Sequence, residues 1–244
     1  MEKKHTIIIG AGLVGSLLSI YLSKRGYPVK IFERRSDMRK TDMVAGRSIN
    51  LALSDRGIKA LEEVGLMDDI RKICIPMHGR YMHNADGTTA YQPYGKEGQY
   101  INSVSRGELN CKLMDLSEQH GVEIHFNQKC EHIDWHKNEL TLQDAITLKP
   151  STLNFQLLFG SDGAYSAARL THQLQQDRFQ YSQYFIDFGY KELNIPAGEN
   201  GAFLLEKHAL HIWPRGNYMM IALPNMDGSF TCTLFFPFDG EVSF

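Results

Sequence analysis

The residues from Thr6 to Arg35 constrain the fold more than any other part of the chain. A short isoleucine run leads into a Gly-x-Gly-x-x-Gly pattern, an apolar-periodic stretch follows, and residues 29–32 form a second apolar run. This order predicts strand, tight turn, helix and strand, which together make a βαβ unit. Gly10 permits the tight turn, Gly12 leaves room for a phosphate beside the backbone, and Gly15 lets the helix pack closely on the strand.

An acidic residue closes the second strand of this unit. Glu33 lies about 20 residues after the glycines, where a carboxylate can accept hydrogen bonds from ribose hydroxyls. The helix N-terminus supplies free N–H groups and a positive dipole end for phosphates. An ordinary βαβ turn is the alternative, but it does not explain why an acidic residue closes the strand. The segment therefore predicts a Rossmann-like dinucleotide-binding domain.

Composition narrows the class of protein. The chain has 244 residues, 43% of them hydrophobic, and a formal net charge of −2, so it carries no broad positive field for nucleic acid. It has no apolar run long enough for a membrane span, and the first strand begins too near Met1 for a signal peptide. Its cysteines form no Cys-x-x-Cys pair and its histidines no His-Glu-x-x-His pattern, so we expect no metal site. These features favour a cytoplasmic protein with reduced thiols.

The hydrophobic pattern changes along the chain. Up to residue 178 we expect helices over 54–64 and 105–119, strands over 122–126 and 157–159, and a meander over 128–153. Beyond Phe179, period-2 segments dominate, at 183–193, 202–213, 218–223 and 229–236. The fold class predicted is α/β, with an antiparallel sheet in a second, α+β domain.

A second motif follows the apolar run at 157–159. Asp162, Gly163, Ser166 and Arg169 are spaced as Asp-Gly-x-x-Ser-x-x-Arg before a helical pattern. The aspartate can accept from a ribose or fix the loop, and a capped helix start is the plain alternative. With the glycine pattern before it, this element resembles that of the class A flavoprotein aromatic hydroxylases. The resemblance implies a p-hydroxybenzoate hydroxylase-like fold, bound FAD, and an element that serves both the flavin and NAD(P)H.

The same resemblance implies a set of cofactor contacts. Arg106, at the start of the helix over 105–119, reaches the flavin, although a surface arginine is the alternative. Cys130 approaches the adenine side through its backbone. The remaining expected contacts are Gly10, Gly12, Val14, Gly15, Glu33, Arg34, Ala52 and Asp162. The FAD-binding domain is expected over 1–72 and 103–178, and the substrate domain over 73–102 and 179–244.

Within that family the chain resembles the kynurenine 3-monooxygenases. The resemblance is carried by the segments 46–54, 92–95, 103–106, 211–215 and 220–225. It implies hydroxylation of L-kynurenine to 3-hydroxykynurenine with NADPH and O₂, a step of tryptophan degradation. It also implies that Arg80 and Tyr94 hold the amino-acid end of the substrate. A guanidinium binds a carboxylate bidentately and a phenol adds an oriented donor, whereas the alternative is an ordinary arginine and tyrosine of a turn.

Alternation along two strands predicts an apolar wall. Met219, Ile221 and Leu223 share one face of their strand, and Thr231, Thr233 and Phe235 share one face of the next. Facing a flavin, Ile221, Leu223, Thr233 and Phe235 would contact an aromatic substrate, although plain core packing is the alternative. Because the cofactor carries the difficult chemistry, we name no catalytic side chain.

The chain also departs from the family. No Gly-Asp dipeptide occurs in it, whereas the family has one late in its sequence, and the chain ends at Phe244, where the family continues. We therefore expect a truncated, N-terminal portion. Two alternatives remain open: a flavin hydroxylase of another aromatic acid, or a fragment without activity.

Overall fold

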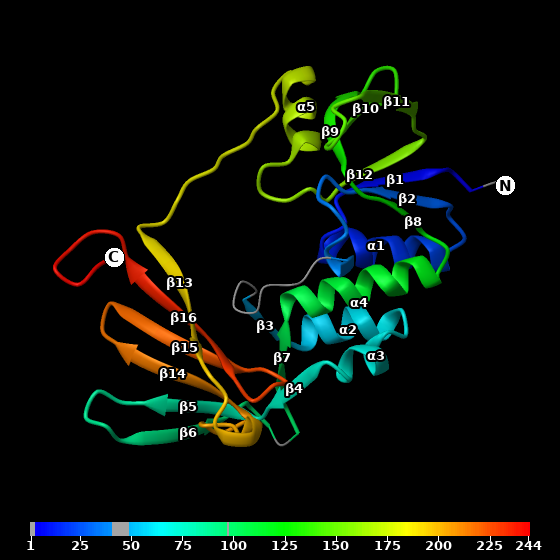
Figure 1. Ribbon diagram of the computed structural model, residues 1–244. Coiled ribbons are helices and arrows are strands. Elements are labelled where there is room, and N and C mark those ends of the chain that lie inside the picture. The colour runs from blue at the N-terminus through cyan, green and yellow to red at the C-terminus, as the bar shows by residue number, and fades with distance from the viewer. Residues whose placement is uncertain (1–2, 41–48, 97) are drawn as a thin grey trace. The chain divides into compact units, whose positions relative to one another are not determined.

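The computed structural model describes residues 3–40, 49–96 and 98–244. The chain divides into two compact units (Figure 1): unit 1 comprises Met1–Met43 and Asn110–Ser182, and unit 2 comprises Val44–Leu109 and Gln183–Phe244. The division falls inside helix α4 (Arg106–Gln119). The domains predicted from the sequence, 1–72 with 103–178 and 73–102 with 179–244, concern which residues serve cofactor and substrate, and they stay a prediction.

Unit 1 is built on a parallel four-stranded sheet with the order β12-β1-β2-β8. Its strands are β1 (Thr6–Ile9), β2 (Val29–Phe32), β8 (Glu123–His125) and β12 (Leu157–Gly160). Helix α1 (Leu13–Lys24) connects β1 to β2, so the predicted βαβ unit is present. All of β1 is buried, as expected for a strand with both faces covered.

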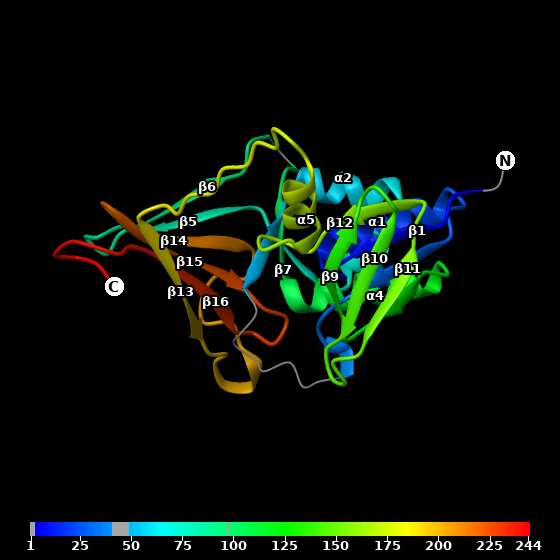
Figure 2. The same ribbon diagram turned by 90° about the horizontal axis from the view of Figure 1, so that it is seen from above.

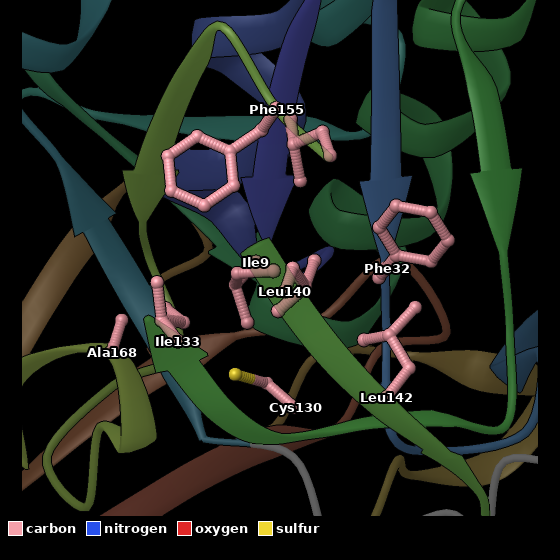
Figure 3. Packing of buried hydrophobic residues seen from close by; sticks show 9 residues of the cluster. Ile9, Phe32, Cys130, Ile133, Leu140, Leu142, Phe155 and Ala168 are labelled. Atoms are coloured by element: carbon pink, nitrogen blue, oxygen red, sulfur yellow. The ribbon is translucent and has the colours of Figure 1, made fainter. Parts of the chain in front are cut away.

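Two layers cover this sheet. Ile8 and Ile31 pack with Met114 of α4 on one face. Ile7 and Ile9 point to the other face, where the predicted meander and helix α5 cover them (Figure 3). This second layer consists of β9 (Gln128–Asp134), β10 (Glu139–Asp144), β11 (Pro150–Asn154) and α5 (Ala167–Gln175). Because successive side chains of β1 are buried in different layers, the isoleucine run is continuous.

Unit 2 contains a six-stranded sheet with the order β13-β16-β15-β14-β5-β6 (Figure 2). Its strands are β5 (Gly79–His83), β6 (Thr89–Pro93), β13 (Phe188–Ile195), β14 (Ala209–Arg215), β15 (Tyr218–Pro224) and β16 (Phe230–Pro237). The prediction of a purely antiparallel sheet is wrong in one pairing, because β14 runs parallel to β5. These two strands come from distant segments and no hairpin joins them, so nothing forces them antiparallel.

Two of the predicted strands are shorter than their period-2 segments. The segment 202–213 is strand only from Ala209, and the segment 183–193 only from Phe188. In the first case the alternation has another cause. Phe203 and Leu205 lie on the core around Phe230, so a loop follows the apolar pattern of a strand.

A second, three-stranded sheet of unit 2 joins the large one through side-chain hydrogen bonds. Its order is β3-β7-β4, with β3 (Asn50–Leu53), β7 (Ile101–Ser105) and β4 (Cys74–Met77). Asn50 Nδ2 donates to Asn225 Oδ1 at 2.6 Å, and Ser103 Oγ donates to the Pro224 carbonyl at 2.8 Å. These bonds fix the β15–β16 turn.

Short helices complete both units. They are η1 (Met38–Lys40) in unit 1, and α2 (Asp55–Glu63), α3 (Met67–Arg71) and η2 (Glu199–Gly201) in unit 2. No helix within the described ranges combines the length and apolar character needed to cross a membrane.

One face of the large sheet holds a pair of histidines, of which His211 is buried and His83 is partly buried. Nε2 of His211 lies 2.8 Å from the Glu206 carbonyl, which can only accept, so this nitrogen carries the proton. Nδ1 of His211 then accepts from Nε2 of His83 at 2.9 Å. The His83 ring stacks on Trp213 at a centroid distance of 4.2 Å. Burial lowers the pKa of both imidazoles below the ordinary 6.5, and for His211 the bond to Glu206 offsets this only partly.

This pair predicts a loss of stability on mild acidification. Below about pH 6.5 the histidines of the unfolded chain take up protons, whereas His83 and His211, with their lowered pKa values, do so only at lower pH. The free energy of unfolding should therefore fall as the pH drops below 6.5. Urea unfolding at a series of pH values measures this. His211→Gln should flatten the dependence, whereas His136→Gln, an exposed control in a turn, should leave it intact; equal slopes in both variants would contradict the assignment.

Candidate cofactor and substrate sites

The glycine loop between β1 and α1 is held by close backbone contact. Gly10 has a φ of +98°, and a Cβ atom there would lie 2.7 Å from the Ser161 carbonyl oxygen. A Cβ atom at Gly15 would overlap the Gly10 carbonyl oxygen and approach Ser161 Oγ to 2.6 Å. Gly12 differs, because a Cβ atom there would meet nothing within 4 Å. Gly10 and Gly15 are thus required for close packing, whereas Gly12 borders open space beside the start of α1.

The N-terminus of α1 is free to meet an anion. Gly12 occupies the N-cap position without a side-chain cap, the first turn holds no acidic residue, and Val14 is 69% exposed. The start of α5 is closed instead. Asp162 accepts from the N–H groups of Ala167 at 2.7 Å and Ala168 at 3.2 Å. The first helix therefore leaves its N–H groups and positive dipole end for a ligand.

Glu33 ties the end of β2 to the glycine loop. One carboxylate oxygen accepts from the Ala11 N–H at 2.9 Å, and the other accepts from Nε of Arg35 at 2.9 Å. Burial by itself raises the pKa of Glu33, but the hydrogen bonds from Arg35 and Ala11 outweigh it and hold the pKa below its usual range. The carboxylate is therefore ionised at neutral pH, and it also braces the loop, a role the sequence did not suggest. Its neighbour Arg34 is exposed.

A cavity of about 330 Å³ in unit 2 and one of about 270 Å³ in unit 1 lie beside the predicted residues. The cavity in unit 1 lies at the carboxyl ends of β1 and β2. It is lined by Ala11, Glu33, Arg35, Ser36, Met38, Asn110, Met114 and Phe126. The edge formed by the carboxyl ends of parallel strands is where α/β sheets bind their ligands.

The Asp-Gly-x-x-Ser-x-x-Arg element bonds mainly to itself. Asp162 also accepts from Ser166 Oγ at 2.6 Å, and Ser166 Oγ in turn accepts from the Arg169 N–H. Arg169 lies over the Tyr181 ring, 4.4 Å from its centroid. The predicted alternative, a capped helix start, is therefore present, and a cofactor contact of Asp162 stays a prediction. Cys130 packs its side chain into the core, where burial and then Asp162 and Glu131 raise the pKa of its thiol to about 12.

Two predicted cofactor residues belong to unit 2. Ala52 lies exposed on β3, and Arg106 lies exposed as the first residue of α4, with its N–H donating to the Ile49 carbonyl at 3.3 Å. An exposed guanidinium at this position is compatible with either predicted reading, a flavin contact or a surface arginine. Residues 46–48, which carry part of the family resemblance, lie outside the described residues.

Arg80 and Tyr94 lie together, and their predicted contact with a substrate stays a prediction. The Arg80 guanidinium sits over the Tyr94 ring at 4.9 Å from its centroid. The Tyr94 hydroxyl is buried and has no hydrogen-bond partner among the described residues, and Tyr94 lines the 330 Å³ cavity. Burial raises the pKa of Tyr94 above its usual value, with a partial offset from Arg80, so the phenol stays protonated at neutral pH.

The strand register places the predicted wall and Arg80 on one face of the large sheet. Thr233 lies opposite Ile221, Ile221 opposite Ile212, and Ile212 opposite Met82, two residues along β5 from Arg80. Residues directly opposite each other share a face, and so do residues two apart in one strand. By the same register, Leu223 and Phe235 belong to this face too.

The core of unit 2 lies on the other face. Ala222, Phe230 and Cys232 form that core and are almost fully buried, whereas Ile221, Thr233 and Phe235 are only partly buried. The plain core-packing alternative therefore applies to the opposite face of these strands and, on the predicted face, to Leu223, which is only 3% exposed. The predicted face is left with a partly open, mainly apolar surface and a guanidinium near it.

Comparison with known proteins identifies the family. A family model described as FAD binding domain matches residues 3–228. The chain belongs to this FAD-binding domain family. It is 51% identical over 245 residues to a kynurenine 3-monooxygenase of Myxococcus xanthus, covering 99% of the chain and 53% of the relative. It is 44% identical to the enzyme of that name from Sus scrofa, over 98% of the chain and 50% of the relative.

The chain thus spans about half the length of the curated relatives it matches. Solved structures show the same fold at low identity. The p-nitrophenol 4-monooxygenase of Pseudomonas putida matches with a TM-score of 0.78 and 18% identity, over 99% of this chain and 60% of that one. A 2-methyl-3-hydroxypyridine-5-carboxylic acid oxygenase matches with a TM-score of 0.77 and 19% identity, over 97% and 60%. The predicted fold class and the predicted resemblance are confirmed.

The structure also shows residues that sequence reasoning missed. Ser161 lies where a Cβ atom at Gly10 or at Gly15 would point, so it is the residue against which both glycines pack. Asn110 lines the cavity beside Glu33. Ser161 gave no signal, because its role depends on two segments that meet only in the fold. Asn110 gave a weak one, as a polar residue next to Leu109 on the buried side of a helix.

The glycine geometry predicts unequal effects of two alanine substitutions. Gly15→Ala should destabilise the cofactor-free protein by about 1–3 kcal/mol, because its Cβ atom overlaps backbone that cannot move cheaply. Gly12→Ala should stay within about 0.5 kcal/mol of the parent, because φ is −73° and the space is open. Chemical unfolding of both variants is the measurement, and equal destabilisation would show that the loop packs differently.

Proposed function

We propose that this chain is the FAD- and substrate-binding portion of an enzyme that hydroxylates L-kynurenine at position 3, with NADPH and O₂ as co-substrates. The observation that carries the proposal is the shared sheet face of Arg80, Ile221 and Thr233, which combines a guanidinium with a mainly apolar wall. Relatives with that enzyme name at 44–51% identity support it. Because the chain spans half of each relative, the activity is proposed for the whole protein.

The residues of unit 1 fit the cofactor. The open N-terminus of α1 and the space beside Gly12 suit the pyrophosphate. Glu33, ionised and at the end of β2, suits the ribose hydroxyls. Arg34, Ala52, Arg106, Cys130 and Asp162 remain proposed contacts of the same cofactor. When bound, reduced FAD supplies the activation of O₂ and NADPH supplies the electrons.

The residues of unit 2 fit the substrate. Kynurenine carries a carboxylate at one end and a flat aminophenyl ketone at the other. We assign the carboxylate to Arg80, whose fork of donors matches it, with the protonated hydroxyl of Tyr94 as a second donor. The ring would then lie along Ile221, Leu223, Thr233 and Phe235. The protein thereby orients the ring and excludes water from it.

Formation of 3-hydroxykynurenine tests the activity. Protein loaded with FAD is given NADPH, O₂ and L-kynurenine, both as this chain and as a longer protein that contains it, and the product is measured by chromatography. Simple benzoates serve as the comparison, because an arginine anchor also suits other aromatic acids. Hydroxylation of benzoates but not of kynurenine would favour the second candidate, a hydroxylase of another acid. FAD binding without any turnover in either protein would favour a binding fragment.

The carboxylate assignment predicts a selective effect of Arg80. Arg80→Ala should weaken kynurenine binding by about 1.5–3 kcal/mol, roughly tenfold to a hundredfold in Kd, because a charge-assisted hydrogen-bonded pair is lost. The decarboxylated analogue should bind the parent and the variant alike. Calorimetric titration of both ligands measures this, with Arg56→Ala, an exposed arginine of α2, as control. Equal weakening of both ligands would show that Arg80 is not the anchor.

A further inference from the structure

Asn110 is a buried amide with unused hydrogen-bonding capacity. It lies on α4, is 7% exposed, and lines the cavity beside Glu33. Its Nδ2 group donates to the sulfur of Met38 at 3.3 Å, a weak acceptor. Its Oδ1 atom has no hydrogen-bond partner among the residues that the structure describes. Exchanging the two ends of the amide would not help, since Nδ2 would then lack an acceptor.

Such an arrangement is unfavourable in the protein alone. A buried polar atom without a partner loses its hydration and gains nothing in return. A leucine of similar size would avoid that loss. Asparagine at position 110 therefore makes the cofactor-free protein less stable than leucine would. This is typical of residues whose hydrogen-bond partner belongs to a ligand.

The cavity around Asn110 has the chemistry of a nucleoside site. Met38, Met114 and Phe126 give it apolar walls that suit a flat heterocycle. Glu33 and Asn110 add acceptors, and the Ala11 backbone joins the cavity to the glycine loop. Both oxygens of Glu33 already accept hydrogen bonds from protein, whereas the buried Asn110 Oδ1 has no partner among the described residues.

We propose that this cavity takes the adenosine end of the dinucleotide and that Asn110 Oδ1 accepts a hydrogen bond from it. The inference rests on the proposed binding of FAD, and it adds a residue of α4 to the contacts expected from the glycine loop and Glu33. Asn110 then acts as a positioning residue: it fixes the adenosine and takes no part in the reaction.

Titration with two flavins tests the proposal. FAD and FMN share the isoalloxazine ring, but only FAD carries adenosine. Asn110→Leu should raise the Kd for FAD about tenfold, the effect of one hydrogen bond, and leave the Kd for FMN unchanged. The Tm of the cofactor-free variant should equal or exceed that of the parent. Flavin fluorescence gives the Kd values and thermal unfolding gives the Tm.

A matched control separates this effect from general repacking. Asn102 on β7 is also buried, at 3% exposure, and its Nδ2 group also lacks a partner among the described residues, but it does not line this cavity. Asn102→Leu should leave the Kd for FAD unchanged. If Asn110→Leu folds poorly, Asn110→Ala removes the same acceptor without added bulk and should show the same loss for FAD alone.

The outcomes distinguish the inference from the proposed function. Unchanged FAD affinity in Asn110→Leu and Asn110→Ala, or equal weakening of FAD and FMN, would overturn the inference only. Failure of the parent protein to bind FAD would overturn both. Normal FAD binding with no hydroxylation of kynurenine would overturn the proposed substrate and leave the Asn110 contact standing. Competition by ADP, 2′-deoxy-ADP and inosine diphosphate then shows whether Asn110 accepts from the ribose or from the adenine amino group.

Discussion

Ser161, directly after β12, packs against the glycine loop between β1 and α1, and the geometry of that loop depends on this contact. Ser161 Oγ lies 2.8 Å from the Ile9 carbonyl and 3.0 Å from the Gly10 carbonyl, and its N–H donates to Ile9 at 2.8 Å. Gly10 and Gly15 leave just enough room for it. These contacts of Ser161 hold the end of β1 beside the end of β12. They thereby fix where α1 begins and in which direction its free N–H groups point.

The remaining polar groups of unit 1 follow from that loop. Glu33 accepts from Ala11 in the loop, and its low pKa keeps it charged. Asp162, directly after Ser161, occupies the start of α5 and so closes the other helix that begins nearby. The first N–H groups of α5 are therefore bonded within the protein, whereas α1 has no side-chain cap at its N-terminus. This asymmetry supports the proposal that the loop binds an anion.

In unit 2 the two faces of one sheet differ in burial, and the substrate proposed above is assigned to the more open face. His211, Ala222 and Cys232 belong to the buried face, and Arg80, Ile221 and Thr233 to the partly open one. Since side chains alternate along each strand, a shift of one residue in register would exchange the two sets. The histidine pair, bonded to the Glu206 carbonyl, helps to specify that register.

Much of this could be predicted from local pattern. The βαβ unit, the meander and the common face of Ile221 and Leu223 follow from spacing alone, because each depends on neighbouring residues. The register that places Thr233 opposite Ile221 joins two strands and needed coordinates. The parallel pairing of β14 with β5 could not be predicted, because it joins segments far apart in the chain. The hydrogen bond from Ala11 to Glu33 and the capping of α5 by Asp162 could not be predicted either. Sequence spacing does not tell which N–H group donates to a given carboxylate. Arg80 and Tyr94 were found through family resemblance, since an arginine and a tyrosine near a turn are common by themselves.

Equilibrium titration of this chain with FAD tests whether the glycine loop holds the pyrophosphate. We expect one FAD per chain in the parent protein and none in Gly12→Val, because the valine side chain would fill the open space beside the helix start, where we place the pyrophosphate. The cofactor-free variant should still be folded by circular dichroism. A folded Gly12→Val protein that binds FAD with the stoichiometry and Kd of the parent would show that the pyrophosphate does not bind beside Gly12.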